Sequence, residues 1–242
     1  MRKNVSLLQI FVQINVAISY KLVQKNVDMK RNVLSKLIDW KNKKNRKPLI
    51  LNGARQVGKT YILREFGSQC YEKMAYVNCD KNKMLEKIFS QDYNISRILL
   101  SLSAILHVNI EPGNTLIIFD EIQESPTVLN SLKYFCEDAP QYHVAVAGSL
   151  LGISLHNNTS FPVGKVDMIK MYPMTFDEFL MAIGEQPLVD ILATKDFSII
   201  DSLSVRFIDC LRQYYYVGGM PAAVAEFAST KNLEEVRSEE HT

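Results

Sequence analysis

The stretch that decides the fold reads Gly53-Ala-Arg-Gln-Val-Gly58-Lys59-Thr60. It follows a short apolar run, residues 48–52, and precedes an amphipathic segment, so a buried strand should lead into a loop and a helix should follow it. Glycines let the backbone curl around an anion, and a helix N-terminus adds the positive end of its dipole. In this context the pattern G-x-x-x-x-G-K-[ST] predicts a phosphate-binding loop.

Each part of this loop has an expected role toward a nucleotide. The Lys59 ammonium would neutralise the terminal phosphates, and the Thr60 hydroxyl would face Mg²⁺. Arg55 is expected to use its side chain on a nearby acid or a partner, while its backbone belongs to the loop. The predicted nucleotide-binding residues are Gly53, Ala54, Arg55, Gln56, Val57, Gly58, Lys59, Thr60 and Tyr61.

A second signal is the apolar run 116–119, which is followed directly by Asp120 and Glu121. Ligands of open α/β sheets gather at the carboxyl ends of the strands, so these acids should meet the loop. Asp120 is expected to hold Mg²⁺, and Glu121 to polarise an attacking water. The alternative is a pair of acids that only cap the next loop. The phosphate loop favours the first interpretation, with one site for ATP and Mg²⁺.

Ser149 stands at the tip of a further apolar run, 144–147. In a nucleotide site its hydroxyl would orient the lytic water, which makes Ser149 a catalytic candidate beside Lys59 and Glu121. The alternative, that Ser149 merely caps the next helix, stays open. A serine-hydrolase elbow is excluded, because Ala147 stands where the pattern G-x-S-x-G requires glycine.

Apolar runs alternate with amphipathic segments, which predicts an α/β fold: a three-layer sandwich with a mainly parallel five-stranded sheet. One helix should begin at Lys59 and end at Gly67, and another should be capped by Asp80. The expected strands are 48–52, 75–78, 116–119, 144–147 and 166–171.

From Thr175 the strands stop, and a capping box, Thr175-Phe-Asp-Glu178, opens a helical segment that is expected to act as a lid. This segment reads as helical to residue 226 except at Gly218-Gly219. We expect a helix–helix turn with core tyrosines at 214–216; closure of this loop over adenine is the alternative. Apolar side chains of the segment are expected to lack a partner, namely Phe176, Phe179 and Leu180.

The expected organisation has four parts. Residues 1–28 are expected to be a non-native extension, because polar residues interrupt the apolar run 5–20 and Met29 begins a more ordinary sequence. Residues 29–174 form the core and 175–236 the helical region. The last six residues, Arg237-Ser-Glu-Glu-His-Thr242, are what a common sequencing-adapter DNA encodes in frame, so 237–242 are expected to be an adapter-derived tail.

Composition indicates little about partners, since the net charge is only +2. The densest basic run, 41–47, has no interleaved aromatic residues, which favours a solvated loop over a nucleic-acid patch. Four widely spaced cysteines fit a reducing cytoplasm and argue against a zinc ribbon or a disulfide framework. No apolar stretch reaches the length of a membrane span.

Several stretches together resemble a prokaryotic family of AAA-superfamily ATPases over about residues 29–227. The matching stretches are Gly53–Thr60, Asp120-Glu-Ile-Gln123, Ala147-Gly-Ser149, Tyr172-Pro-Met-Thr-Phe-Asp-Glu-Phe179 and Val217-Gly-Gly-Met-Pro221. The resemblance implies ATP hydrolysis with Glu121 as base and Ser149 as sensor. It also implies a nuclease-like C-terminal domain beyond this chain, through which DNA would bind, and it leaves self-association open.

One departure concerns the residue that reaches a neighbouring subunit's nucleotide. Family members often have Gly-Arg before the fifth strand, where this chain has Gly164-Lys165. Lysine lacks the planar fork of arginine, so a solvated Lys165 is favoured over a finger. Other finger candidates are Arg97, Arg206 and Arg212.

The leading hypothesis is an ATPase that drives or gates a C-terminal effector. A GTPase would need N-K-x-D, but Asn82-Lys83 is followed by Met84-Leu85. A small-molecule kinase is disfavoured, because kinases usually avoid a water-activating acid at the position of Glu121. A non-catalytic, nucleotide-gated module that binds protein or DNA remains the alternative.

Overall fold

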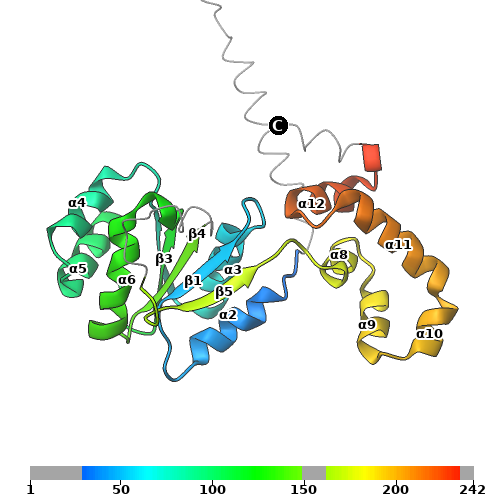
Figure 1. Cartoon of the computed structure of the whole chain (residues 1–242), viewed down its shortest axis with the longest axis horizontal. Helices are drawn as coiled ribbons and strands as arrows, with labels where there is room; N and C mark the ends of the chain where they lie inside the picture. The colour runs from blue at the N-terminus through cyan, green and yellow to red at the C-terminus, as the bar shows by residue number, and fades with distance from the viewer. Residues whose placement is uncertain (1–28, 149–161, 235–242) are drawn as a thin grey trace, which may run out of the picture. The chain divides into compact units, whose positions relative to one another are not determined.

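The computed structural model describes residues 29–148 and 162–234. The chain divides into two compact units (Figure 1). The first, Asn32–Tyr172, contains the sheet, and the second contains helices and is built, within the described residues, from 29–31 and 173–234. Ser149, the third catalytic candidate, lies outside the described residues.

A five-stranded sheet forms the centre of the first unit (Figure 1). Every strand pairing is parallel, in the order β2-β3-β4-β1-β5, which confirms the predicted α/β fold and its parallel sheet. The strands are β1 (Leu49–Gly53), β2 (Lys73–Asn78), β3 (Thr115–Asp120), β4 (His143–Gly148) and β5 (Asp167–Met171).

Helices cover both faces of this sheet, so the predicted three layers are present (Figure 1). All residues of β1, β3 and β4 are buried, as expected for parallel strands with both faces covered. One face carries α2 (Val33–Asn42) and α3 (Lys59–Cys70), and the other carries α4 (Lys83–Gln91), α5 (Ile95–Leu106) and α6 (Pro126–Asp138).

The register brings the carboxyl ends of four strands to one level. Asn52 at the end of β1 pairs with Gly148 at the end of β4, and Asn78 at the end of β2 pairs with Asp120 at the end of β3. Loops that leave these strands therefore meet at one edge of the sheet, which we call the carboxyl edge.

Two expected helix boundaries are wrong. Helix α3 does not stop at Gly67 but continues to Cys70, because Gly67 serves close packing: a Cβ at this position would lie 2.7 Å from Met74 Sδ. Helix α4 is not capped by Asp80. Its first turn is capped instead by the Asn82 side chain, which accepts a hydrogen bond of 3.0 Å from the backbone N–H of Leu85.

The second unit contains the helices predicted after Thr175. The capping box is confirmed, with the backbone N–H of Thr175 donating to Glu178 Oε2 at 3.0 Å. The helices of this unit are α8 (Phe176–Ala182), α9 (Gln186–Thr194), α10 (Phe197–Ser202), α11 (Ser204–Val217) and α12 (Pro221–Thr230).

Helix α8 is covered by the helices that follow it, so the expectation of unpartnered apolar surface is wrong for its main residues. Phe179 and Leu180 are fully buried. Phe179 packs with α11 and α12, for example against Phe227, and Leu180 packs with residues of α9 and α11 such as Phe207. These contacts give the helical unit two apolar clusters of its own.

A buried ion pair stands beside these clusters. Arg31 Nε donates to Glu178 Oε2 at 3.1 Å, and the two side chains are only 5% and 4% exposed. The same Glu178 oxygen caps α8 through Thr175, so one carboxylate serves a helix end and a distant cation. Residues 147 positions apart in sequence thus complete one local structure.

The Gly218-Gly219 segment is the turn between α11 and α12. The backbone N–H of Met174 donates to the Gly219 carbonyl, and the Tyr214 hydroxyl donates to the Met174 carbonyl, both at 2.7 Å. A Cβ on Gly219 would lie 2.5 Å from the Met174 carbonyl oxygen, so only glycine fits. Tyr214 is half-buried, whereas Tyr215 and Tyr216 are 75% and 43% exposed, so the expectation of core tyrosines is wrong for these two.

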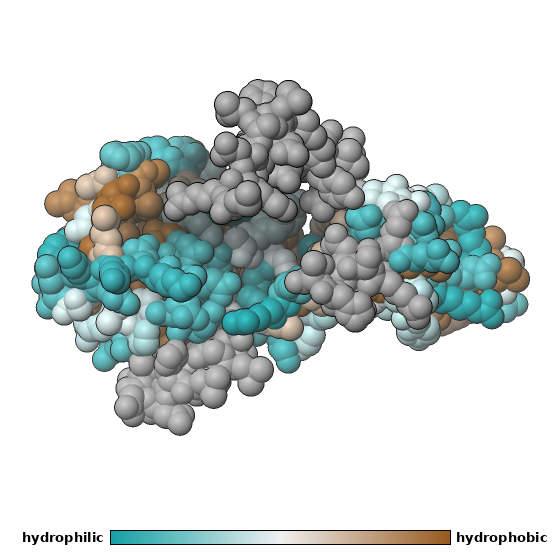
Figure 2. All heavy atoms as spheres, turned by 90° about the horizontal axis from the view of Figure 1, so that it is seen from above, coloured by the Kyte–Doolittle hydropathy of each residue, from teal (hydrophilic) through white to brown (hydrophobic). Residues whose placement is uncertain are grey.

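Figure 2 shows apolar side chains gathered over α4 and α5. Exposed apolar residues of these two helices are Met84, Leu100 and Ile105. Across the described parts of the chain, no helix combines the length and apolar character that crossing a bilayer requires.

Candidate functional site

The β1–α3 loop has the shape that its glycines predict. Gln56 and Gly58 take positive φ angles of 63° and 91°, so the backbone turns sharply before α3 begins at Lys59. At the other end of the loop, Gly53 lies against the Met171 carbonyl of β5 so closely that a Cβ would overlap it. Backbone geometry at Gly53, Gln56 and Gly58 therefore sets the path of this loop.

A cavity of about 680 Å³ opens at the carboxyl edge beside this loop. Its size falls within the usual range of small-molecule sites. The structure brings most of the predicted loop residues and one predicted acid to it, and adds residues from β2 and η2 (Ile122–Glu124). The lining residues are Arg55, Gln56, Gly58, Lys59, Thr60, Tyr61, Asn78, Asp80, Glu121, Gln123 and Glu124.

The Lys59 ammonium folds back onto the loop. It donates to the carbonyls of Gly53 and Ala54, at 3.0 Å and 2.7 Å. Partial burial lowers the pKa of Lys59 from its ordinary value, while the carboxylates of Glu121 and Asp120 act in the opposite direction. An ammonium group beside a helix N-terminus suits an anionic ligand.

Asp120 and Thr60 meet directly. The Thr60 hydroxyl donates to Asp120 Oδ2 at 2.7 Å, and the Tyr76 hydroxyl donates to the same oxygen at 2.8 Å. The backbone N–H of Glu121 donates to Oδ1 at 3.0 Å. Asp120 is only 4% exposed, and three donors compensate for the burial of its charge. Burial and the neighbouring Asp120 raise the pKa of Tyr76, which therefore remains a donor at neutral pH.

Glu121 stands at the cavity in a constrained backbone conformation, with φ of 52°. With this left-handed conformation the chain turns away from the line of β3, and Glu121 caps the start of η2. Two residues later, Gln123 Nε2 donates to Glu121 Oε2. Gln123 is largely buried and lines the same cavity, so its amide holds the carboxylate from the cavity wall.

Comparison with known proteins decides the family. Residues 45–180, more than half of the chain, match the family described as "AAA domain". The chain belongs to this family. The matched range of the AAA domain contains the β1–α3 loop and the two acids after β3.

Solved structures with similar folds come from several organisms. A variant of Thermotoga maritima RuvB is 18% identical with a TM-score of 0.42, covering 66% of this chain and 51% of its own. Aeropyrum pernix ORC1, solved in complex with DNA, is 13% identical with a TM-score of 0.43, covering 86% and 63%. C. elegans PCH-2 is 13% identical with a TM-score of 0.34, covering 76% and 47%. The chain thus spans about half to two-thirds of these proteins. No curated protein matches it significantly.

In β1 the AAA domain contains a polar residue that the sequence analysis did not single out. Asn52, the residue before the end of β1, pairs with Gly148 of β4 and is 5% exposed. Its Oδ1 has no hydrogen-bond partner in the structure as described. Asn52 therefore places an available acceptor beside Gly148, where β4 ends.

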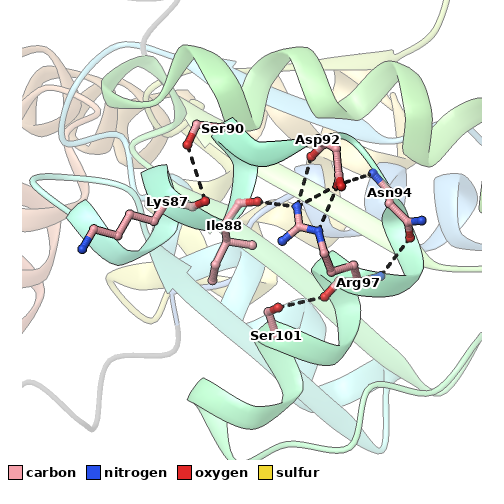
Figure 3. Close-up of polar contacts among 7 residues, drawn as sticks. All are labelled: Lys87, Ile88, Ser90, Asp92, Asn94, Arg97 and Ser101. Atoms are coloured by element: carbon pink, nitrogen blue, oxygen red, sulfur yellow. Dashed lines mark hydrogen bonds and ion pairs between the residues drawn. The ribbon is translucent and has the colours of Figure 1, made fainter.

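The guanidinium of Arg97, one of the finger candidates, lies within its own helical hairpin (Figure 3). Its Nε and Nη2 donate to Asp92 Oδ1 at 3.0 Å and 2.8 Å, and Nη2 also donates to the Ile88 carbonyl at 2.7 Å. Asn94 caps the same turn through the Arg97 backbone N–H at 3.0 Å. These bonds fasten the end of α4 to the start of α5, which is a structural role.

The other finger candidates of the AAA domain and the helical unit also have acidic neighbours. Lys165 Nζ pairs with Glu137 at 2.9 Å on the surface of the sheet unit. In the helical unit, Arg206 bonds both oxygens of Glu185, and Arg212 pairs with Asp209 on its own helix. By contrast, Arg55 is exposed and lines the cavity.

The basic run 41–47 contributes largely to internal structure. Lys43 and the backbone of Lys47 bond Asp167 at the start of β5, and Lys47 Nζ bonds the Gly164 carbonyl. Arg46 bonds the carbonyls of Lys41 and Pro140. The interpretation as a loop after a helix therefore has direct support.

Tyr76 and Gln123, which bond the two acids of the site, were missed from sequence, each for a definable reason. Tyr76 reaches Asp120 from the neighbouring strand, and a single sequence does not reveal which strands are neighbours. Gln123 lies only two residues after Glu121, so the local spacing was visible. Its role depends on the left-handed turn at Glu121, which sequence patterns do not predict for glutamate.

Proposed function

We propose that this AAA domain binds ATP with Mg²⁺ at the β1–α3 loop and hydrolyses it. One arrangement carries the proposal: Lys59, Thr60 and Glu121 line one cavity, and Asp120 is bonded directly to Thr60 at its edge. ATP is favoured over GTP because the acid of an N-K-x-D motif is missing after Asn82-Lys83.

The oxygen donors of Thr60 and Asp120 fit Mg²⁺, a hard cation. Within the described residues no group of three or more His, Cys, Asp or Glu side chains could hold a metal ion. That agrees with Mg²⁺ chemistry, since this ion usually takes one or two protein ligands, and phosphates and water complete its shell. When bound, the ion neutralises charge that develops between the phosphates.

The remaining roles follow from side-chain chemistry. The loop N–H groups hold phosphate oxygens, and the Lys59 ammonium exchanges its two carbonyl partners for them. The Glu121 carboxylate accepts a proton from the attacking water. Ser149 orients that water from the end of β4. In this proposal the loop supplies binding and Glu121 supplies turnover.

A second candidate is a nucleotide-gated interaction module with little turnover. The observation that favours it is the hydrogen bond from Gln123 to Glu121, which occupies one oxygen of the proposed base. In this reading the contact is a restraint, and removing it with Gln123→Ala increases the rate of phosphate release. In the ATPase reading the contact positions the base, and the same substitution lowers the rate.

Phosphate release by the purified chain tests both candidates. We expect Mg²⁺-dependent release from ATP, none with EDTA, and a lower rate in Gln123→Ala. Absence of any nucleotide binding at millimolar ATP and Mg²⁺ would refute the proposed function. If the parent chain binds ATP without releasing phosphate, and Gln123→Ala releases phosphate faster than the parent, the gated module is the better interpretation.

We further propose that nucleotide state drives or gates a C-terminal effector in the cytoplasm, with self-association and DNA as partner classes. The family resemblance supports this part of the proposal. Adding duplex DNA to the release assay, and repeating it over a range of protein concentrations, tests the two partner classes separately. A rate of phosphate release that depends neither on DNA nor on protein concentration would contradict DNA binding and self-association.

A further inference from the structure

Tyr76 joins two elements of the site across the sheet. It lies on β2 in register with Ile118, two residues before the pair formed by Asn78 and Asp120. Side chains two residues apart on a strand share a face, so Tyr76 and Asp120 point to the same side of the sheet. This is the side covered by α3 (Figure 1).

Helix α3 meets this pair with two residues. The Thr60 hydroxyl donates to the same Asp120 oxygen as Tyr76, and the Arg64 guanidinium lies over the Tyr76 ring, 3.9 Å from its centroid. Positions four residues apart lie on one face of a helix, which explains why Thr60 and Arg64 both reach this point. A cation so placed is attracted by the face of the ring.

We propose that Tyr76 and Arg64 are positioning residues for the metal site. The Tyr76 hydroxyl fixes the Asp120 carboxylate, and the Arg64 cation fixes the Tyr76 ring. A carboxylate that already has its working orientation loses less rotational freedom when an ion binds. Partners of this kind typically change metal affinity about 10- to 100-fold when they are removed. The inference rests on the proposed function, because it assigns Asp120 to Mg²⁺.

The substitution Tyr76→Phe removes the hydroxyl, with its bonds to Asp120 and Arg64, and keeps the ring beneath the Arg64 guanidinium. We measure binding of a fluorescent ATP analogue while Mg²⁺ is titrated, with an EDTA baseline. The expected result is an increase of about 10- to 100-fold in half-saturating Mg²⁺, with unchanged affinity in EDTA. Arg64→Met keeps the length of an exposed side chain and should give a smaller increase, about two- to fivefold.

A matched control is available beside the same helix. Tyr71, which directly follows α3, makes a bond of 2.7 Å to His143 Nδ1, and His143 begins β4. Tyr71→Phe therefore removes the same atom from a comparable hydrogen bond at the opposite edge of the sheet. It should lower the midpoint of urea unfolding and leave half-saturating Mg²⁺ unchanged.

The possible results distinguish a wrong positioning role for Tyr76 and Arg64 from a wrong proposed function. If the parent chain binds the analogue with clear Mg²⁺ dependence and both Tyr76→Phe and Arg64→Met keep the parental midpoint, the positioning role is wrong and the proposed function stands. An equal increase of half-saturating Mg²⁺ in Tyr71→Phe would also overturn the positioning role, because the effect would then reflect a general loss of stability. If the parent shows no Mg²⁺-dependent binding, the proposed function itself fails.

Discussion

The two edges of the same sheet use one hydrogen-bond type for opposite purposes. At the carboxyl edge, the Tyr76 hydroxyl donates to the buried Asp120 carboxylate beside a cavity. At the amino edge, the Tyr71 hydroxyl meets His143, which contacts the rings of Tyr71 and Trp40 edge-on, at centroid distances of 5.3 Å and 6.2 Å. Burial lowers the pKa of His143 to about 4, and the nearby Arg46 and Lys41 add to the effect.

This comparison shows how parallel topology separates chemistry from packing. At the carboxyl edge, loops leave the strands and keep charged groups such as Lys59 and Glu121 around an open volume. At the amino edge, aromatic rings pack against His143 and burial keeps it neutral. If the comparison is right, substitutions at the first edge change ligand binding and turnover, and those at the second change stability.

The largest expected effect is on turnover and belongs to Glu121→Gln. Glutamine keeps the size and can still hydrogen-bond water, but it does not accept a proton. We expect phosphate release to slow by about 10²- to 10⁴-fold with little change in ATP affinity. Parental release by this variant would show that Glu121 is not the base.

The paired variant Asp120→Asn should differ in kind. It weakens the proposed hold on Mg²⁺, so affinity for the ATP·Mg²⁺ complex falls together with the rate. Identical phenotypes in the two variants would contradict the separate roles assigned to these neighbouring acids.

The next effect is on affinity. Lys59→Ala removes a cation whose present partners are two exchangeable carbonyls, and it leaves the core intact. Hydrogen bonds to charged groups contribute about 1.5–3 kcal/mol, so ATP affinity should fall about 10- to 100-fold or more. Calorimetry measures the affinity, and circular dichroism confirms the fold. If folded Lys59→Ala bound ATP with wild-type affinity, the assignment of this site to ATP would be wrong.

A smaller effect concerns pH and the amino edge. The folded chain keeps His143 neutral down to a pKa of about 4, whereas the unfolded chain takes up the proton near the ordinary pKa of 6.5. The unfolded state therefore binds more protons between these values. The stability contributed by neutral His143 is present above about pH 6.5 and is lost as pH falls toward 4.

The substitution His143→Gln removes this titration and keeps an acceptor for Tyr71. Urea unfolding at pH 7 and at pH 4.5 should show a smaller loss of stability in His143→Gln than in the parent. Equal losses would mean that other groups dominate the acid response.

The smallest effect is expected at Lys165, whose ion pair with Glu137 lies on the surface. Exposed pairs contribute about 0–1 kcal/mol, so Lys165→Ala should change stability little and leave ATP affinity unchanged. Turnover per protomer should be equally insensitive at all protein concentrations. A concentration-dependent loss of turnover would restore the finger role that its surface pairing argues against.

Sequence was a good guide wherever chemistry or packing repeats locally. The loop from Gly53 to Thr60, the buried strand before Asp120 and the capping box at Thr175 are all readable from neighbouring residues. Each depends on backbone or burial rules that act within a few positions.

Errors arose where the decisive partner was distant in sequence. Gly67 looked like a helix stop because its neighbour Met74, on the next strand, was not known. Phe179 and Leu180 looked exposed because the helices that cover them follow much later in the chain. Tertiary contacts, rather than propensities, settled both. Arg97 is a different case, because its partner Asp92 is only five residues away and the turn after α4 brings the two side chains together.

The buried pair of Arg31 and Glu178 has a consequence for the order in which the molecule can mature. During synthesis the cation emerges before the whole sheet unit, and its carboxylate partner emerges 147 residues later. The helical unit therefore reaches its final form only after the intervening core has been made. A fragment of residues 173–234 lacks Arg31, so Glu178 would lose its cation in an apolar setting. The free energy of unfolding of the fragment should be about 3–5 kcal/mol lower for this reason. Adding a separate peptide that carries Arg31 should restore the stability that the excised helical fragment lacks.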